Sequence, residues 1–75
     1  MVLEKYWQRA SEAKNHNANI VILDALSQDP NSYVRSLVAQ NPNSNIEILS
    51  NLSKDESEEV RIEVARNPIC NSEIL

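Results

Sequence analysis

The sequence predicts an all-α protein built as a short solenoid of paired helices, and three observations support this prediction. The chain has 75 residues, enough for one small domain and too few for separate modules. It contains no glycine but ten asparagines, the next most favourable residue for helix ends and tight turns. Most of these asparagines fall in three evenly spaced clusters, at 15–19, 41–45 and 67–71. Regular spacing of this kind indicates an internal repeat.

Shifting the sequence by one 26-residue period makes the repeat explicit. Between the second and third copies, eleven of the twenty-one shared positions are identical, including the Val-Arg pair at 34–35 and the Asn-Pro pair at 41–42. Between the first and second copies, ten of twenty-six positions match. We therefore expect a single domain over residues 1–75, with copies at roughly 3–28, 29–54 and a shorter one at 55–75.

Each copy is expected to form two short helices, and the second copy shows this most clearly. One face of its first helix is apolar and comprises Val34, Leu37 and Val38. This helix should end at Asn41, because the following Pro42 disfavours helical backbone at the residue before it. The second helix should start where Ser44 or Asn45 accepts the free first-turn N–H groups. Its apolar stripe comprises Ile46, Ile48, Leu49 and Leu52.

The first and third copies begin differently. The first copy is expected to open with a longer helix over residues 2–14 that caps the stack. The apolar side of that helix comprises Leu3, Tyr6, Trp7, Ala10 and Ala13. In the third copy, Asp55 followed by Glu58 has the spacing of a capping box, although Ser57 is an alternative cap. We therefore expect the copies to share their turns and apolar positions but to differ at their starts.

Charge and cysteine content exclude several classes of function. Seven basic against eleven acidic side chains give a net charge of −4, the wrong sign for a protein that wraps nucleic acid. The longest apolar run, residues 20–23, is far too short to span a membrane, and the start does not resemble a signal peptide. The single cysteine, Cys70, cannot form an internal disulfide. We expect a cytoplasmic protein that binds neither nucleic acid nor membrane.

Few residues are candidates for chemistry. His16 is a lone loop histidine, so we interpret it as a solvated residue. Cys70 has no neighbouring histidine or lysine in the sequence, so we interpret it as a small packing residue. No paired acid and base, glycine-rich loop or metal-ligand spacing occurs, so we expect no enzymatic activity, cofactor or metal. Tyr6, Trp7 and Tyr33 form either a stacking surface or part of the core. Packing in the core or at its rim is favoured, because Trp7 and Tyr33 occupy equivalent positions beside apolar neighbours.

Two charged features remain. Arg35 and Arg61 recur at one position of the repeat, and Asp29 and Asp55 recur at its turns. A partly buried arginine needs an acceptor, so we expect a structural ladder of these four residues that pairs Arg61 with Asp29 or Asp55. The marked acidic run comprises Asp55, Glu56, Glu58, Glu59 and Glu63. It is either a solvated helix start or a docking surface for a basic protein partner.

The pattern Asp-Pro-x-x-x-Val-Arg-x-x-Val-Ala-x-Asn-Pro starts at Asp29, and an Ile-Leu-x-x-Leu segment follows it up to Leu52. It returns from Asp55 with glutamate in place of the first proline, whereas the first copy lacks the Val-Arg and Asn-Pro pairs. These two copies resemble the leucine-rich repeat variant family and, more broadly, HEAT-type helical repeats. The resemblance implies a right-handed superhelix of paired short helices. The iron–sulfur segment that such proteins can carry is not expected, because no cysteine precedes Cys70.

The expected function is that of a small scaffold for protein–protein interaction. The alternatives are a HEAT-like protein that binds nucleic acid or processes bases, and a piece of a longer solenoid. The C-terminal copy is short, so we expect some of its apolar side chains to lack a covering repeat: Val60, Val64, Ile74 and Leu75. An uncovered end favours a homodimer through this copy, with fraying of the last helix as the alternative.

Overall fold

The computed structural model describes residues 6–69, and this part of the chain is all-helical, as the sequence predicts. Its five helices are α1 (Tyr6–Ala13), α2 (Ile20–Leu26), α3 (Ser32–Gln40), α4 (Ile46–Leu52) and α5 (Glu58–Arg66). None of the helices in the described range is long and apolar enough to cross a membrane.

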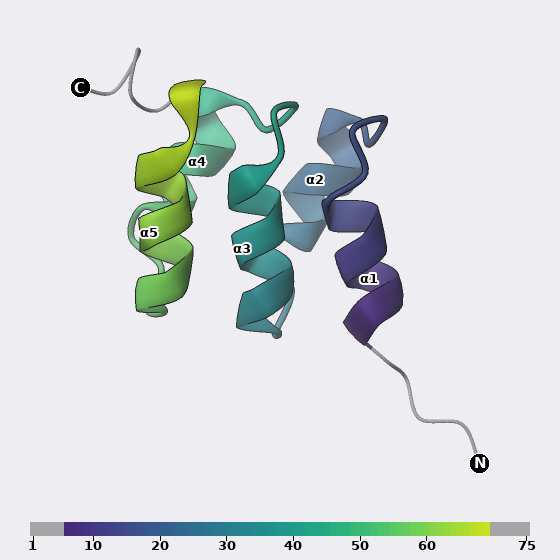
Figure 1. Ribbon diagram of the computed structural model, residues 1–75, viewed down its shortest axis with the longest axis horizontal. Helices are drawn as coiled ribbons and strands as arrows, with labels where there is room; N and C mark the ends of the chain where they lie inside the picture. The colour runs from purple at the N-terminus through teal and green to yellow at the C-terminus, as the bar shows by residue number, and fades with distance from the viewer. Residues whose placement is uncertain (1–5, 70–75) are drawn as a thin grey trace.

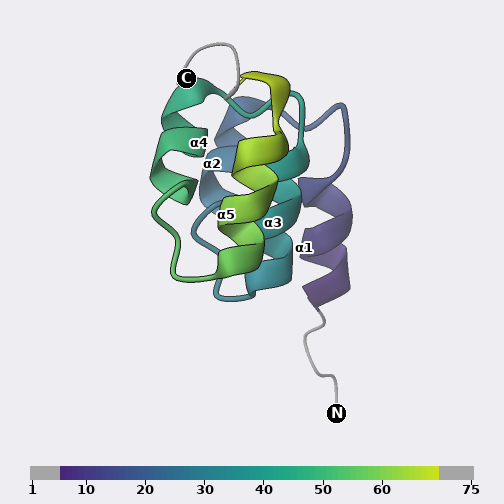
Figure 2. The ribbon, with the colours of Figure 1, turned by 60° about the vertical axis from the view of Figure 1, so that its left-hand side comes forward.

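The helices lie in two layers. In Figure 1, α1, α3 and α5 stand side by side with α3 in the middle, and α2 and α4 lie behind them. The turned view in Figure 2 separates the pair α2 and α4 from the row of three. Consecutive helices therefore alternate between the layers. In the first two copies of the sequence, each copy contributes one helix to each layer.

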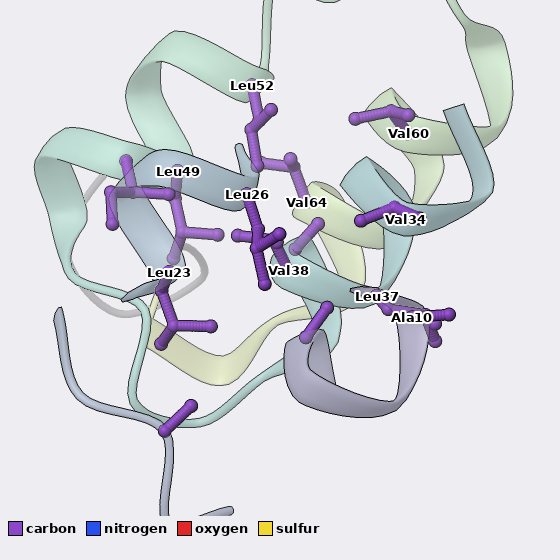
Figure 3. Close-up of a cluster of buried hydrophobic side chains, with 14 residues drawn as sticks. Ala10, Leu23, Leu26, Val34, Leu37, Val38, Leu49, Leu52, Val60 and Val64 are labelled. Atoms are coloured by element: carbon purple, nitrogen blue, oxygen red, sulfur yellow. The ribbon is translucent and has the colours of Figure 1, made fainter. Parts of the chain in front are cut away.

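The core lies between these layers and receives side chains from all five helices (Figure 3). Leu23 of α2 and Leu49 of α4 stand at equivalent positions of successive copies, and both are 0% exposed. Burying one such side chain fully contributes roughly 1.5–3 kcal/mol. The other buried hydrophobic residues are Ala10, Ala13, Ala18, Leu26, Val34, Leu37, Val38, Ala39, Ile48, Leu52, Val60 and Val64.

Asparagines begin the three middle helices. Asn19, Asn31 and Asn45 are the N-caps of α2, α3 and α4, and each side-chain oxygen accepts a hydrogen bond from a first-turn N–H. Of the two caps proposed for α4, Asn45 is therefore the one used. The hydroxyl of Ser44 instead donates to the carbonyl of Val38 at 2.6 Å, which ties the turn to the preceding helix.

Asparagine also ends α3 and α5, as the Asn-Pro pattern predicts. Asn41 and Asn67 are the C-caps, with ψ angles of 128° and 127°. Extended backbone at these positions is what the following proline requires.

The start of α5 differs from the expected capping box. Ser57 is the N-cap, but its side chain makes no capping hydrogen bond. The carboxylate of Asp55 accepts the Ser57 N–H at 2.9 Å and also pairs with Arg35. A capping box between Asp55 and Glu58 is thus wrong, because the aspartate lies two residues before the cap.

The side of α1 that corresponds to the buried face of α3 is polar and exposed. Gln8, Ser11 and Glu12 of α1 are exposed, while the equivalent residues of α3 are the buried Val34, Leu37 and Val38. The helix expected over residues 2–14 is described only from Tyr6, and in that part it does not exceed α3 in length. Residues 2–5 lie outside the described range.

The reason given for a homodimer needs correction. Val60 and Val64 are 0% and 2% exposed and form part of the core, so they are not uncovered. The apolar residues of α5 that are exposed on the side away from α3 are instead Ile62 and Ala65. Ile74 and Leu75 lie outside the described residues.

Candidate protein-binding surface and the ladders that hold it

Two arginine–aspartate pairs tie each copy to the next. Arg9 Nε donates to Asp29 Oδ2 at 2.5 Å and Nη2 to Oδ1 at 3.4 Å. Arg35 makes the same forked contact with Asp55, at 2.8 and 3.1 Å. Each pair joins the first helix of one copy to the turn that opens the next. A two-pronged contact fixes direction as well as distance, so each pair orients neighbouring helices.

The second pair is largely buried, with side-chain exposures of 12% for Arg35 and 9% for Asp55. Burial raises the pKa of Asp55, but hydrogen bonds from Arg35 and from the Ser57 N–H more than offset it, so the pKa lies below its ordinary value. The hydrogen bond to Asp55 raises the pKa of Arg35 despite burial. Each ion therefore stabilises the charged form of the other.

Arg61 contacts Asp55, one of the two partners expected for it, but through the main chain and not through the carboxylate. Its Nη1 donates to the main-chain oxygen of Asp55 at 2.6 Å, and it pairs with the carboxylate of neither Asp29 nor Asp55. The carboxylate of Asp55 is bound by Arg35 instead, because Arg9 and Arg35 each reach forward to the turn that opens the next copy. Arg9 completes the ladder, and its match to Arg35 in the repeat alignment was the signal for it.

A second ladder consists of asparagine side chains. Asn41 Nδ2 donates to the carbonyls of Ala13 and Asn15 at 2.7 and 2.9 Å. Asn67 Nδ2 donates to the carbonyls of Ala39 and Asn41 at 2.8 and 3.5 Å. The amide of Asn41 thus binds the C-terminal end of α1, and the amide of Asn67 binds the C-terminal end of α3.

The asparagine ladder lies inside the molecule, with Asn41 and Asn67 only 2% and 3% exposed. Their Oδ1 atoms accept the backbone N–H of Asn43 and Ile69, which fixes the orientation of each amide. Sequence reasoning assigned these asparagines to helix ends and missed the contacts between copies. Their recurrence once per copy was the signal that pointed to such a role.

The three aromatic residues are not in the core. Trp7 is 60% exposed, Tyr6 44% and Tyr33 42%, so of the expected positions, burial inside the core is wrong. The rings of Tyr6 and Tyr33 meet edge to face with centroids 6.0 Å apart. In the described part of the chain, no helix layer covers the outer face of α1, α3 and α5 (Figure 2). Trp7, Tyr33 and Glu59 occupy equivalent positions on these helices, and we call them the aromatic–acidic row.

The structure divides the acidic run by role. Glu56, Glu58 and Glu59 are exposed, and the last two lie in the first turn of α5. Asp55 is committed to Arg35, while Glu63 is half-buried and lies 3.8 Å from Arg66. The carboxylates available to a partner are thus those beside the aromatic–acidic row.

The other candidate sites have fewer side chains that could bind a ligand or react. His16 is exposed in the turn after α1, and Cys70 lies outside the described residues. Within residues 6–69, no three side chains of the metal-ligating types gather to hold an ion. A hollow of about 580 Å³ lies over the Arg35–Asp55 pair, whose charges are already satisfied by each other.

A groove of about 360 Å³ lies on the opposite layer, between α2 and α4. Its walls include Val21, which is 72% exposed, and the carboxylates of Asp24 and Glu47. This groove lacks an aromatic side chain and serves below as the comparison surface.

No family model, curated protein or solved structure matches this chain.

Proposed function

We propose that the protein is a short right-handed solenoid of 26-residue copies that serves as a scaffold for protein–protein interaction, without catalytic activity. Both ladders support this proposal, because their hydrogen bonds recur at equivalent positions of successive copies. Contacts made once per copy are characteristic of proteins in which each repeat touches only its neighbours. The resemblance to leucine-rich repeat variant and HEAT-type proteins is consistent with this architecture.

The aromatic–acidic row is the observation that carries the binding function. Trp7 and Tyr33 expose large apolar rings to water, and aromatic side chains of this kind are enriched at the centres of protein interfaces. The face of an aromatic ring also attracts arginine and lysine. Glu59 continues the row with a carboxylate. The partner is thus a segment that combines basic and apolar side chains.

Charge and rigidity also favour this partner. The chain carries a net charge of −4, and Glu56 and Glu58 add to the negative potential around the row. An acidic surface speeds the approach of a basic segment and disfavours acidic ones. The ladders hold α1, α3 and α5 in place before binding, so less conformational entropy is lost on association.

Selection from a random peptide library displayed on phage tests the proposal. We expect the selected peptides to be basic and to contain apolar residues, and we expect their affinity to fall as salt rises. Trp7→Ala and Glu59→Lys should each weaken binding at least about tenfold, the loss of a contact of roughly 1.4 kcal/mol. Glu47→Lys makes the same charge change in the groove between α2 and α4 and is the matched control.

Two results would overturn the proposal. In the first, the selected peptides bind Trp7→Ala and Glu59→Lys as tightly as the original protein, while Glu47→Lys or Val21→Ala abolishes binding. The partner would then occupy the α2–α4 groove. In the second, no basic peptide is selected, or nucleic acid binds with a steep salt dependence; either outcome rejects a basic protein partner.

A further inference from the structure

The guanidinium of Arg61 is held in the pose of Arg35 but lacks the carboxylate that Arg35 binds. Arg35 Nη1 donates to the carbonyl of Asp29 at 2.7 Å, and Arg61 Nη1 donates to the carbonyl of Asp55 at 2.6 Å. In Arg35, the Nε and Nη2 groups then hold the Asp55 carboxylate. Within the described residues, the hydrogen bond to the Asp55 carbonyl is the one that the Arg61 guanidinium makes.

The side of α5 around Arg61 corresponds to a covered side of α3. Next to Arg35, the equivalent residues Ser36 and Ala39 are both 0% exposed, because α5 packs against α3. On α5 itself, Ile62 is 47% exposed and Ala65 is also exposed. We call Arg61, Ile62 and Ala65 the open side of α5. It combines an oriented cation with an apolar strip.

We infer that the open side of α5 is a docking site for an amphipathic helix of a partner polypeptide whose entry turn carries an aspartate. The chain contains two such helices already docked. Asp29 and Asp55 each lie two residues before an N-cap, and each binds the arginine of the preceding copy. Their carboxylates show what Arg61 is positioned to receive. Charge complementarity between Arg61 and an aspartate defines the occupant.

The two docked helices also define the rest of the partner segment. Counted from the aspartate, valines follow at the fifth and ninth residues, and an asparagine follows at the twelfth. The valines of α3 and α5 are buried. Each asparagine donates to carbonyls at the end of the neighbouring helix in the row of three, which is α1 for Asn41 and α3 for Asn67. On α5 the corresponding carbonyls belong to Ala65 and Asn67. The segment therefore reads Asp-x-cap-x-x-Val-x-x-x-Val-x-x-Asn.

A second molecule of this protein that stacks end to end does not match the site. Stacked end to end, it would present α1, which carries Gln8 and Glu12 where the docked helices carry valines. Its residue equivalent to Asp29 is Leu3, which has no carboxylate. The two aspartates with the right turn geometry are already bound to Arg9 and Arg35. The occupant that we infer is therefore a partner helix that carries the aspartate and both valines, and this inference does not depend on the aromatic–acidic row.

A synthetic peptide with the sequence of residues 28–42 is the probe, because it contains the aspartate, the cap, both valines and the asparagine. Titration into the isotope-labelled full chain is followed by NMR. We expect saturable shifts of the Arg61 Nε–H and of the Ile62 and Ala65 amides. An Asp→Asn peptide should bind the original chain at least tenfold more weakly. Against Arg61→Gln, the two peptides should bind equally, because the carboxylate then has no partner.

A second measurement covers the case in which the short peptide does not form a helix on its own. The sequence of residues 50–67 is appended after Leu75, which places an aspartate one full copy beyond Asp55 in the same chain. We expect the extended protein to unfold several degrees higher than the same extension with asparagine in that place. The difference should disappear in Arg61→Gln. Covalent attachment supplies the helix at a high effective concentration.

Three results would overturn the inference. One is binding of the aspartate and asparagine peptides with equal affinity, or shifts that map away from the open side of α5. Another is that neither the peptide nor the extension depends on the aspartate. The last is a concentration-dependent dimer in light scattering, with its NMR shifts on Ile62 and Ala65, which would assign the open side to a second molecule.

Discussion

Among single residues, Arg35 and Arg61 provide the sharpest comparison. They are equivalent in sequence, but Arg35 is 12% exposed and bound to a buried carboxylate, whereas Arg61 is exposed. Arg35→Met should lower the free energy of unfolding by roughly 2–4 kcal/mol, because it leaves the Asp55 carboxylate buried without its cation. Arg61→Met is the matched control and should change it by less than about 0.5 kcal/mol. Urea unfolding measures both, and equal losses would reject the ladder.

Asp55 makes stability depend on pH in a defined direction. Its pKa is lowered in the folded protein, so protons bind the unfolded chain more readily. The stabilisation is complete above the unfolded pKa of about 4 and is lost as pH falls through the lower folded value. Asp55→Asn should therefore flatten the fall in unfolding free energy below about pH 4. Asp24→Asn, at an exposed position, is the control; identical acid profiles for both variants would contradict this role.

The exact partner of a residue was predictable where both partners are local, whereas the repeat pattern indicated only that long-range contacts recur once per copy. Asn45 caps its own helix, and the sequence named it as one of two candidates. The partners of Asn41 lie 26 and 28 residues earlier and are backbone carbonyls, which leave no mark on the sequence. The exposure of Trp7 was missed for a related reason. Equivalent positions reveal a shared face of a helix, but they do not reveal whether another layer covers that face.

At the level of helices, the two kinds of N-cap give a direct comparison. Asn45 Oδ1 accepts the Ile48 N–H at 2.9 Å, whereas the Ser57 side chain makes no capping hydrogen bond. Asn45→Ala should therefore cost about 1 kcal/mol of unfolding free energy. Ser57→Ala should cost at most a few tenths, since Asp55 already accepts the backbone N–H of residue 57. Thermal unfolding followed by circular dichroism checks both, and a larger loss at Ser57 would contradict the capping assignment.

The helix ends were predictable because proline and asparagine act on their immediate neighbours. The Asn-Pro pairs mark the ends of α3 and α5, and the apolar spacing marks the buried faces. At the start of α5 the sequence offered two caps, and the alternative, Ser57, is the N-cap in the structure. Asp55 satisfies the spacing of a capping box, but its carboxylate is drawn to Arg35, twenty residues earlier in the chain. A long-range ion pair thus replaces a local motif.

At the level of the whole molecule, the regular spacing of the asparagine clusters predicts how many copies of the sequence there are, and the ladders show how they are joined. The arginine and asparagine contacts lie at opposite ends of α3, near its first and last turns. The helix is therefore held at both ends by its neighbours. This arrangement predicts that α1 and α5, which flank α3, unfold together.

Urea unfolding resolved by NMR at each end of the row tests this claim most directly. Ala13 in α1 and Val64 in α5 are 0% and 2% exposed, so the intensities of their amide signals report the two ends. Coupled copies predict one shared midpoint for both residues, and Asp55→Asn should lower it equally at both. A lower midpoint at Val64 with Ala13 unchanged would show that the copies unfold independently, and would contradict a stack held together by its ladders.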